Sequence, residues 1–421
     1  MKVPELLAPA GSLTKAKIAF KYGADAVYAG TSKLSLRTRS ELDSDSLEET
    51  IKYAHSIGKK VYVALNIYAM DADYSEIEKE VQRLKDINAD AIIASDVGVI
   101  SKIKEIAPNM EIHISTQANT VSLEACNFWK TFGAKRIILA RELSKEQIKY
   151  IMDNKKDLEI EMFVHGAICF AYSGRCYLSK YLSNRCANQG DCAQSCRWQY
   201  NITATEVNNK DSSINIDFDE KGTYLFSSKD MCLIKSIPQI IEMGMESLKI
   251  EGRLKTEYYL ATVVRAYRKA IDMYVKLKSE QKENEYNADI LLEELKKVKT
   301  RGLSEFYFSN ATNQDIHDLD GQSENLEYEF AGKIESKVVS SDNIYIMEIK
   351  NKLSIGDELE VLKVDDIAEH KFNITKLYDI KTNEEIDTIN PGVKGQLVKI
   401  YIPYNLEELD ILRKKKQGKI K

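Results

Sequence analysis

The chain has little cysteine for its size, and it lacks the segments that carry a protein into or across a membrane. Seven cysteines among 421 residues are too few for a disulfide-rich scaffold. No apolar leader region and no apolar run long enough to cross a bilayer is present. We therefore expect a cytoplasmic protein with reduced thiols and no membrane partner.

Several familiar active-site motifs are also missing. The chain contains neither the H-E-x-x-H motif of zinc proteases nor the G-x-S-x-G motif of serine hydrolases. A proteolytic activity would therefore need another activated nucleophile or a metal-bound water. The segment Ala8–Ser12, after the first expected strand, does not supply the glycine-rich loop of a dinucleotide site.

The composition is that of an ordinary globular protein with 43% hydrophobic and 30% charged residues. The length allows more than one domain. A formal net charge of −5 argues against general coating of nucleic acid, but it leaves room for a local basic patch. One candidate patch is the run Arg413–Lys416 with Lys419 and Lys421, although a solvated tail is the simpler interpretation.

Short apolar strands alternate with amphipathic helices over the first 250 residues. Four strand starts carry related sequences, in which a small helix-ending residue precedes an apolar run: Tyr22–Val27, Ile87–Ile92, Phe132–Ile137 and Met243–Leu248. Eight βα units of this kind predict a TIM-like (β/α)8 barrel over residues 1–275, and an open doubly wound sheet is the alternative. The expected strands are Glu5–Ala10, Ala26–Gly30, Lys60–Asn66, Ala91–Ser95, Glu111–Gln117, Arg136–Ala140, Glu159–Val164 and Ser247–Glu251.

The pattern changes after the barrel. Residues 276–327 are charged and then irregular, which predicts a helical and irregular connector. From residue 328 the chain shows strand-like alternation with turns, so we expect a small C-terminal all-β barrel domain over 328–405. Residues 406–421 are expected to form a basic tail.

Five of the cysteines crowd into one short stretch. Cys169, Cys176, Cys192 and Cys196 follow the spacing C-x6-C-x15-C-x3-C, and Cys186 falls between the pairs. Zinc favours tight C-x2-C knuckles, which are absent, whereas an iron–sulfur cluster tolerates wider spacing. Buried, inert thiols are the third possibility. The many Gly, Ser, Asn and Gln residues favour a loop around a cluster.

Polar residues lie at the C-terminal ends of the expected strands, where a barrel places its chemistry. The cysteine segment directly follows the seventh strand, so barrel geometry predicts that the thiols face the same end. The polar residues at these ends include Asn66, Asp96, Gln117, Arg141, His165, Glu251 and Arg253.

The run Glu161–Ser179, which reads EMFVHGAICFAYSGRCYLS, resembles the signature of peptidase family U32, the collagenase-like peptidases. Further matches cover essentially the whole chain: Leu6–Gly11, Gly23–Tyr28, Asn188–Cys192, Cys196–Trp198, Ser227–Cys232 and Lys249–Arg253. The resemblance implies an oxygen-independent hydroxylase that carries a [4Fe–4S] cluster on four cysteines.

The length, the β-domain and the run Lys255–Tyr259 resemble the tRNA branch of this family. That branch forms 5-hydroxyuridine at the wobble position of tRNA and depends on prephenate. We accordingly expect tRNA, prephenate and an unidentified electron-transfer protein as partners. The alternatives are a 23S rRNA cytidine hydroxylase, a collagenase-like peptidase, and an RNA-binding protein with a structural cluster.

The same resemblance implies the metal ligands within an iron–sulfur segment that spans residues 165–232. Cys169, Cys176 and Cys192 match the motif, and the fourth ligand is Cys196 or, as the alternative, Cys232. Cys196 is favoured because a C-x3-C pair can hold one edge of a cluster. Cys126 and Cys186 are not expected to be ligands.

Prephenate is a dicarboxylate, which suits the planar fork of arginine. Arg37, Arg39, Arg141 and Arg253 are candidates for this contact. The substrate-binding set is Arg37, Arg39, Asn66 and Gln117, and the catalytic set is His165, Arg141, Glu251 and Arg253. His165 has two possible roles, proton transfer near neutral pH or hydrogen bonding to the cluster loop.

Overall fold

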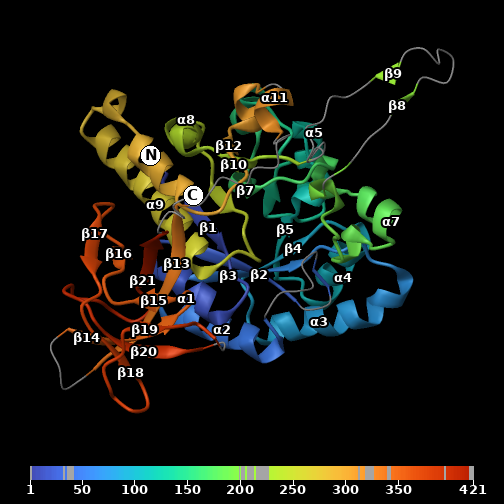
Figure 1. The fold of residues 1–421 in the computed structure, drawn as a ribbon. Coiled ribbons are helices and arrows are strands. Elements are labelled where there is room, and N and C mark those ends of the chain that lie inside the picture. Colours follow the sequence, from blue (N-terminus) through green and yellow to red (C-terminus); the bar gives the residue numbers. More distant parts are fainter. Residues whose placement is uncertain are drawn as a thin grey trace.

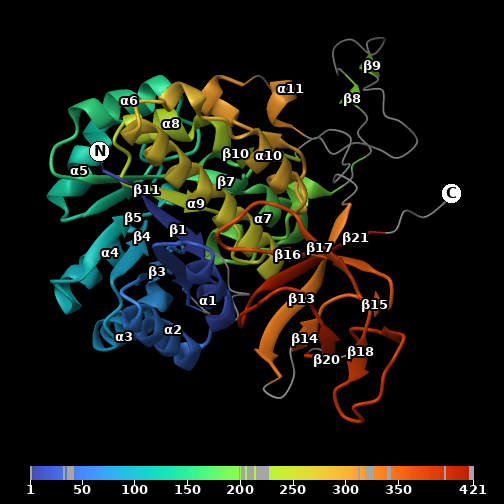
Figure 2. The same cartoon turned by 90° about the vertical axis from the view of Figure 1, so that its left-hand side faces the viewer.

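The computed structural model of the protein describes residues 2–31, 34–35, 42–198, 200, 204–205, 213–214, 227–311, 313–317, 327–338, 343–392 and 395–416. A barrel of parallel strands wrapped by helices forms the larger part, and a small β-domain lies beside it (Figure 1, Figure 2). No helix in these ranges is long and apolar enough to span a membrane.

Eight parallel strands close the barrel, which confirms the predicted TIM-like architecture. Neighbours in the chain pair in order, and the last strand pairs with both the first and the seventh. The strands are short and almost wholly buried, because helices cover one face and side chains fill the interior. They are β1 (Glu5–Pro9), β2 (Ala26–Gly30), β3 (Lys60–Leu65), β4 (Ala91–Ala94), β5 (Glu111–Ile114), β6 (Arg136–Ile138), β7 (Glu159–Ala167) and β11 (Ser247–Ile250).

Local signals in the sequence set the ends of the barrel helices. Serine or threonine side chains at positions 12, 122, 144 and 256 accept hydrogen bonds from the first turns of α1, α5, α6 and α9. At the other end, Gly23 and Gly133 of the repeated motif take positive φ angles that terminate the preceding helix. The helices are α1 (Leu13–Lys21), α2 (Ser44–Ser56), α3 (Tyr74–Asp86), α4 (Val97–Ile106), α5 (Leu123–Thr131), α6 (Lys145–Asn154), α8 (Ile237–Glu242) and α9 (Glu257–Ser279).

The cysteine segment forms an insertion between β7 and α8. It contains the short helix α7 (Leu178–Ser183). A 3-10 turn at Tyr172–Gly174 precedes this helix, and 3-10 turns at Ala187–Gln189 and Ser195–Arg197 follow it. The chain then returns through β10 (Asp230–Cys232), which pairs antiparallel with the end of β7, and β12 (Leu303–Ser304) pairs with β10. These two added strands were not expected from the sequence. A separate two-residue pairing joins β8 (Ala204–Thr205) and β9 (Ser213–Ile214).

The connector contains α10 (Asp289–Lys296) and α11 (Asn313–Ile316), and an antiparallel all-β domain follows it. The main sheet has seven strands in the order β17-β16-β21-β13-β14-β20-β18, and β15 pairs with β19. The strands are β13 (Tyr328–Lys337), β14 (Ile344–Ile349), β15 (Leu353–Ser354), β16 (Glu358–Leu362), β17 (His370–Asn373), β18 (Leu377–Asp379), β19 (Thr388–Ile389), β20 (Leu397–Tyr401) and β21 (Ile411–Lys415).

The expected basic tail over 406–421 is wrong for residues 411–415. These residues form β21, which pairs with both β13 and β16 in the interior of the sheet. Arg413 is buried, and two carboxylates neutralise its charge inside the protein, so it does not contribute to a basic surface. Lys419 and Lys421 lie outside the described residues.

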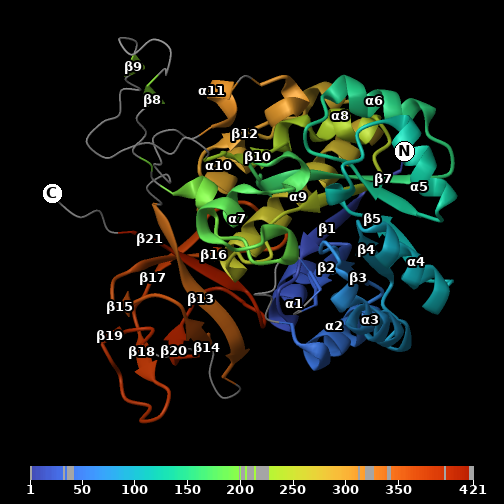
Figure 3. The same ribbon diagram turned by 90° about the vertical axis from the view of Figure 1, so that its right-hand side faces the viewer.

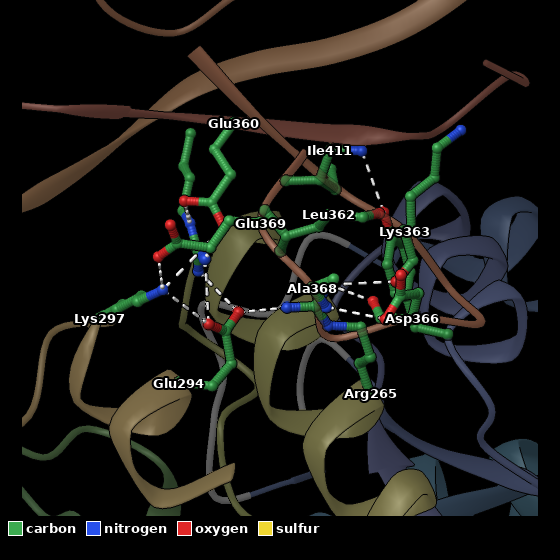
Figure 4. Close-up of polar contacts among 12 residues, drawn as sticks. Arg265, Glu294, Lys297, Glu360, Leu362, Lys363, Asp366, Ala368, Glu369 and Ile411 are labelled. Carbon is green, nitrogen blue, oxygen red and sulfur yellow. Dashed lines mark hydrogen bonds and ion pairs between the residues drawn. The ribbon is translucent and has the colours of Figure 1, made fainter. Parts of the chain in front are cut away.

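A buried ion network joins the two domains. Arg413 of β21 binds Glu294 of α10 and Glu360 of β16, and Arg265 of α9 also binds Glu294. Figure 4 shows the side chains of Glu294, Glu360 and Lys297 turned toward one another across this boundary. In addition, the Tyr22 hydroxyl donates to the carbonyl of Leu362 and accepts from the amide of Ile411, each at 3.0 Å. The β-domain is therefore held by polar contacts to α1, α9 and α10.

Candidate functional site

One cavity of about 570 Å³ opens at the C-terminal ends of the barrel strands. Its walls combine strand-end side chains with the cysteine segment, as the barrel geometry predicted. The predicted site residues among its lining are Asn66, Gln117, Arg141, Glu251, Arg253, Cys169, Cys176, Cys192 and Cys196. Arg37 and Arg39 lie outside the described residues.

The four thiols predicted as favoured ligands share this cavity and influence one another. The pKa of Cys169 is raised to about 11, mainly by burial and to a smaller extent by the neighbouring thiols of Cys176 and Cys196, while the backbone hydrogen bond from Ala171 lowers it. Burial also raises the pKa of Cys196, which Arg197 lowers in part and Cys192 raises. Thiolates crowded in this way are costly unless positive charge neutralises them, and four thiols at one cavity are donors of the kind that zinc and iron–sulfur clusters use.

The three other cysteines do not line the cavity. The Cys232 thiol on β10 lies 3.8 Å from the Tyr267 hydroxyl of α9, and burial raises its pKa to about 11. Cys126 is buried in α5, and Cys186 lies between the thiol pairs. Within the described ranges, no three His, Cys, Asp or Glu side chains converge closely enough to hold a single metal ion.

Arg141 and Arg253 approach the cavity with their guanidinium groups held by aromatic rings. The Arg141 guanidinium lies 3.9 Å from the Phe163 ring centroid, and its Nη1 donates to the Ala167 carbonyl at 2.8 Å. Its Nε has no hydrogen-bond partner among the described residues. The Arg253 guanidinium lies 5.8 Å from the Tyr28 ring centroid. Both side chains are thus oriented, and Arg141 retains unused donor capacity toward a ligand.

The side-chain amides of Gln117 and Asn66 differ in their hydrogen bonding. Gln117 is 2% exposed, and within the described part of the chain neither its side-chain nitrogen nor its oxygen has a hydrogen-bond partner. Buried amides are normally satisfied, so this one is suited to bind a ligand in the cavity. Asn66 instead donates to the Ser115 hydroxyl at 3.3 Å.

Lys249 of β11 is a cavity residue that the sequence reasoning missed. Its Nζ lies 3.0 Å from Glu161 Oε1 and 4.3 Å from the Tyr28 ring centroid. Burial lowers the pKa of Lys249, and the Glu161 carboxylate opposes this effect. The feature of the sequence that could have identified this residue is a lysine between two apolar residues in the strand Ser247–Ile250. Next to it, the Tyr28 hydroxyl lies 3.2 Å from Glu251 Oε2.

His165 is not brought to the cavity with the other predicted catalytic residues. Its ring packs against Tyr259 and Tyr267 of α9, and its Nδ1 lies 3.4 Å from the Tyr267 hydroxyl. Burial lowers the pKa of His165 to about 3, so the ring is neutral at pH 7. His165 therefore occupies a packing position on β7, paired with Cys232 of β10.

The cavity lining carries more basic than acidic side chains, and three of its cations are paired with buried carboxylates behind it: Lys249 with Glu161, and Lys255 and Arg301 with Asp230. Its lining contains two carboxylates, Glu142 and Glu251, against seven basic side chains: Arg141, Arg197, Lys249, Arg253, Lys255, Lys299 and Arg301. Such an imbalance in a concave site with apolar walls attracts an anionic ligand. The same barrel end therefore combines a set of thiols with a binding region for anions.

Comparison with known proteins identifies relatives along the whole chain. The model of peptidase family U32 matches residues 11–318, and the model of the peptidase family U32 C-terminal domain matches residues 326–413. The division falls in the connector that the sequence analysis placed at residues 276–327.

Three full-length relatives carry different names. tRNA hydroxylation protein P1 of Bacillus subtilis is 36% identical, with 99% of this chain and 96% of the relative covered. tRNA hydroxylation protein P of Escherichia coli is also 36% identical, with coverage of 96% and 95%. A collagenase of Porphyromonas gingivalis is 32% identical, with 97% of both chains covered.

Proposed function

Because this chain belongs to peptidase family U32, we propose that it is an RNA hydroxylase that forms 5-hydroxyuridine at the wobble position of tRNA with a [4Fe–4S] cluster and prephenate. The observation that carries the proposal is a cavity whose lining combines four thiols with seven basic side chains. The relatives named as tRNA hydroxylation proteins extend over nearly all of this chain.

Cys169, Cys176, Cys192 and Cys196 are the residues that would hold the cluster. When bound, the cluster would supply electron transfer at the wall of the cavity. The chain's own contribution is to keep these thiols partly buried in one segment beside the cavity. The source of the electrons is a partner protein that the proposal leaves unidentified.

Arg141, Arg253 and Gln117 would bind the co-substrate. A dicarboxylate such as prephenate can accept paired hydrogen bonds from an arginine fork. The Phe163 and Tyr28 rings orient the two guanidinium groups. The Gln117 side-chain amide, which has no hydrogen-bond partner among the described residues, adds a neutral contact. Lys249 adds a third positive charge, held in place by Glu161.

Two alternative functions are an rRNA hydroxylase and a peptidase. A cytidine of 23S rRNA is chemically close to uridine as a substrate, and the cavity does not exclude it. A peptidase is suggested by the name of the collagenase relative. However, the two barrel histidines, His113 and His165, are buried and do not line the cavity, so neither is positioned to activate a nucleophile there.

The decisive experiment is nucleoside mass spectrometry of tRNA and rRNA from a deletion strain complemented with wild-type or Cys169→Ser protein. We expect 5-hydroxyuridine-type nucleosides in tRNA to disappear in the deletion strain and to return only with the wild-type protein. Unchanged tRNA with loss of 5-hydroxycytidine in rRNA would replace the tRNA assignment with the rRNA one. Unchanged nucleosides in both RNAs, in a genome without a related copy, would rule out the hydroxylase proposal.

A further inference from the structure

Five exposed aromatic side chains lie in the cysteine insertion, close in sequence to residues that line the cavity. Phe170, Tyr172, Tyr177, Tyr181 and Trp198, here called the aromatic rim, are 46%, 55%, 73%, 74% and 43% exposed. All five come from the cysteine insertion, and Figure 3 looks onto the part of it that carries α7. Exposed apolar patches on a soluble protein mark interaction sites, so these rings make the insertion a candidate binding surface.

The rim is adjacent to the cavity because lining residues and rings are neighbours in the chain. Cys169 and Ala171 line the cavity and flank Phe170, and Ala171 and Ser173 flank Tyr172 in the same way. Two further lining residues, Cys176 and Arg197, directly precede Tyr177 and Trp198. The Tyr181 ring lies 6.4 Å from the Tyr177 ring, at an interplanar angle of 33°. The insertion thus directs thiols inward and rings outward.

The charge of this segment indicates what it binds. Residues 168–198 contain the basic side chains Arg175, Lys180, Arg185 and Arg197 and one acidic residue, Asp191, in a chain whose net charge is −5. Cores of protein–protein interfaces are depleted of charge, whereas aromatic rings interleaved with basic residues are typical of surfaces that bind single-stranded nucleic acid. The seven basic side chains of the cavity lining extend the positive region inward.

We propose that the aromatic rim is a stacking surface for the unpaired nucleotides that flank the target base. The target base must leave its stack to reach a cavity at the barrel end, and its neighbours then need new stacking partners. The rim supplies such partners without reading their sequence, since every base has a flat aromatic face. The inference rests on the proposed function, because it assigns the RNA loop that this function requires.

Binding can be tested without any assay of activity. The chain has two tryptophans, and Trp129 is buried. A Trp129→Phe variant therefore leaves Trp198 as the fluorescent reporter in the full-length protein. Titration with an anticodon stem-loop should quench Trp198, whereas the same sequence paired to its complement should not. Equal quenching by both RNAs, or loop binding seen by anisotropy without quenching, would overturn the stacking role.

Steady-state kinetics can separate the binding role of the rim from the chemical step. Tyr177→Ala and Tyr181→Ala should each raise the KM for tRNA about tenfold with kcat nearly unchanged, since each removes one stacking ring. Tyr177→Phe keeps the ring and should restore the wild-type KM. The matched control is Tyr150→Ala on α6, which removes a 61% exposed tyrosine that does not line the cavity.

The remaining outcomes distinguish a failure of the rim inference from a failure of the proposed function. If the deletion strain keeps its modified tRNA, the proposed function fails, and the fluorescence titration still decides whether the rim stacks on loop RNA. If wild-type protein modifies tRNA but the alanine variants do so with unchanged KM, only the rim inference fails. If the alanine variants convert a dimer to a monomer by light scattering and bind RNA normally, the rim is an interface between copies of this chain.

Discussion

At the scale of single residues, the two arginines of the cavity provide the sharpest test of anion recognition. Arg141→Lys and Arg253→Lys keep the positive charge but lose the planar fork. We expect each change to reduce prephenate-dependent activity by about tenfold or more, because paired hydrogen bonds to a carboxylate are lost. Steady-state kinetics with varied prephenate would measure the effect.

Iron content should be unchanged in both variants, since neither arginine is a proposed cluster ligand. Arg83→Lys is the matched control, because Arg83 pairs with Glu80 on α3 away from the cavity. Wild-type kinetics in both cavity variants would remove these arginines from the site.

A second residue-scale prediction concerns His113, which is fully buried inside the barrel against the Tyr62 ring. Burial lowers the pKa of His113 below its usual 6.5, while Glu111 opposes the shift. Below that pH the unfolded chain binds a proton that the folded chain does not, so stability is lost as the pH falls. The slope reaches at most about 1.4 kcal/mol per pH unit.

Urea unfolding at pH 7.5 and pH 5.5 would measure this effect. Wild-type protein should lose about 1 kcal/mol more between these two values than His113→Phe, which keeps a ring against Tyr62 but cannot be protonated. An identical pH dependence in the two proteins would show that His113 titrates normally in the folded state.

At the scale of structural elements, the cysteine insertion should behave as one cofactor-binding unit. Anaerobically purified protein should contain about four irons per chain. Serine at Cys169, Cys176, Cys192 or Cys196 should remove most of this iron, because each thiol lines the shared cavity. Iron and sulfide analysis with visible spectra would measure the loss.

Two other cysteines serve as controls of the same chemical kind. Cys126→Ser and Cys232→Ser change buried thiols outside the cavity and should keep the iron. Loss of iron in Cys232→Ser with retention in Cys196→Ser would make Cys232 the fourth ligand. Stoichiometric zinc in place of iron in anaerobic preparations would contradict the cluster itself.

At the scale of the whole molecule, the ion network between the domains should dominate their docking. Arg413→Met would leave the Glu294 and Glu360 carboxylates buried without their main partner. Breaking a buried pair from one side costs about 3–5 kcal/mol, so the free energy of unfolding should fall by that order. Chemical denaturation, followed in parallel by limited proteolysis of the connector, would measure it.

The control is Lys415→Met, two residues along β21, whose side chain is 56% exposed. Adding Glu360→Gln to Arg413→Met should recover part of the loss, because Glu360 then carries no unpaired buried charge while Glu294 keeps Arg265 as its partner. If Arg413→Met matches the control, the network contributes nothing to docking.

Features that depend on local patterns can be predicted from the sequence. The apolar strands and capped helices repeat often enough to specify a barrel, and the expected strands agree with the structure to within about three residues at each end. The order of elements is also sufficient to place the thiols and Arg141 at one end of the barrel, because chemistry in this fold gathers where the strands end. The long motif Glu161–Ser179 was sufficient to identify the family.

The directions of individual side chains depend instead on contacts that form only in the folded protein. The predicted seventh strand stopped at Val164, but β7 continues to Ala167 and pairs with β10, and its register with β11 shifts next to His165. That shift and the antiparallel partner set His165 and Cys232 against α9, whereas Cys196 reaches the cavity. The C-terminal basic run became an interior strand for the same kind of reason, because Glu294 and Glu360 supply partners from distant parts of the chain. Spacing along the chain carries no information about partners that only folding brings together.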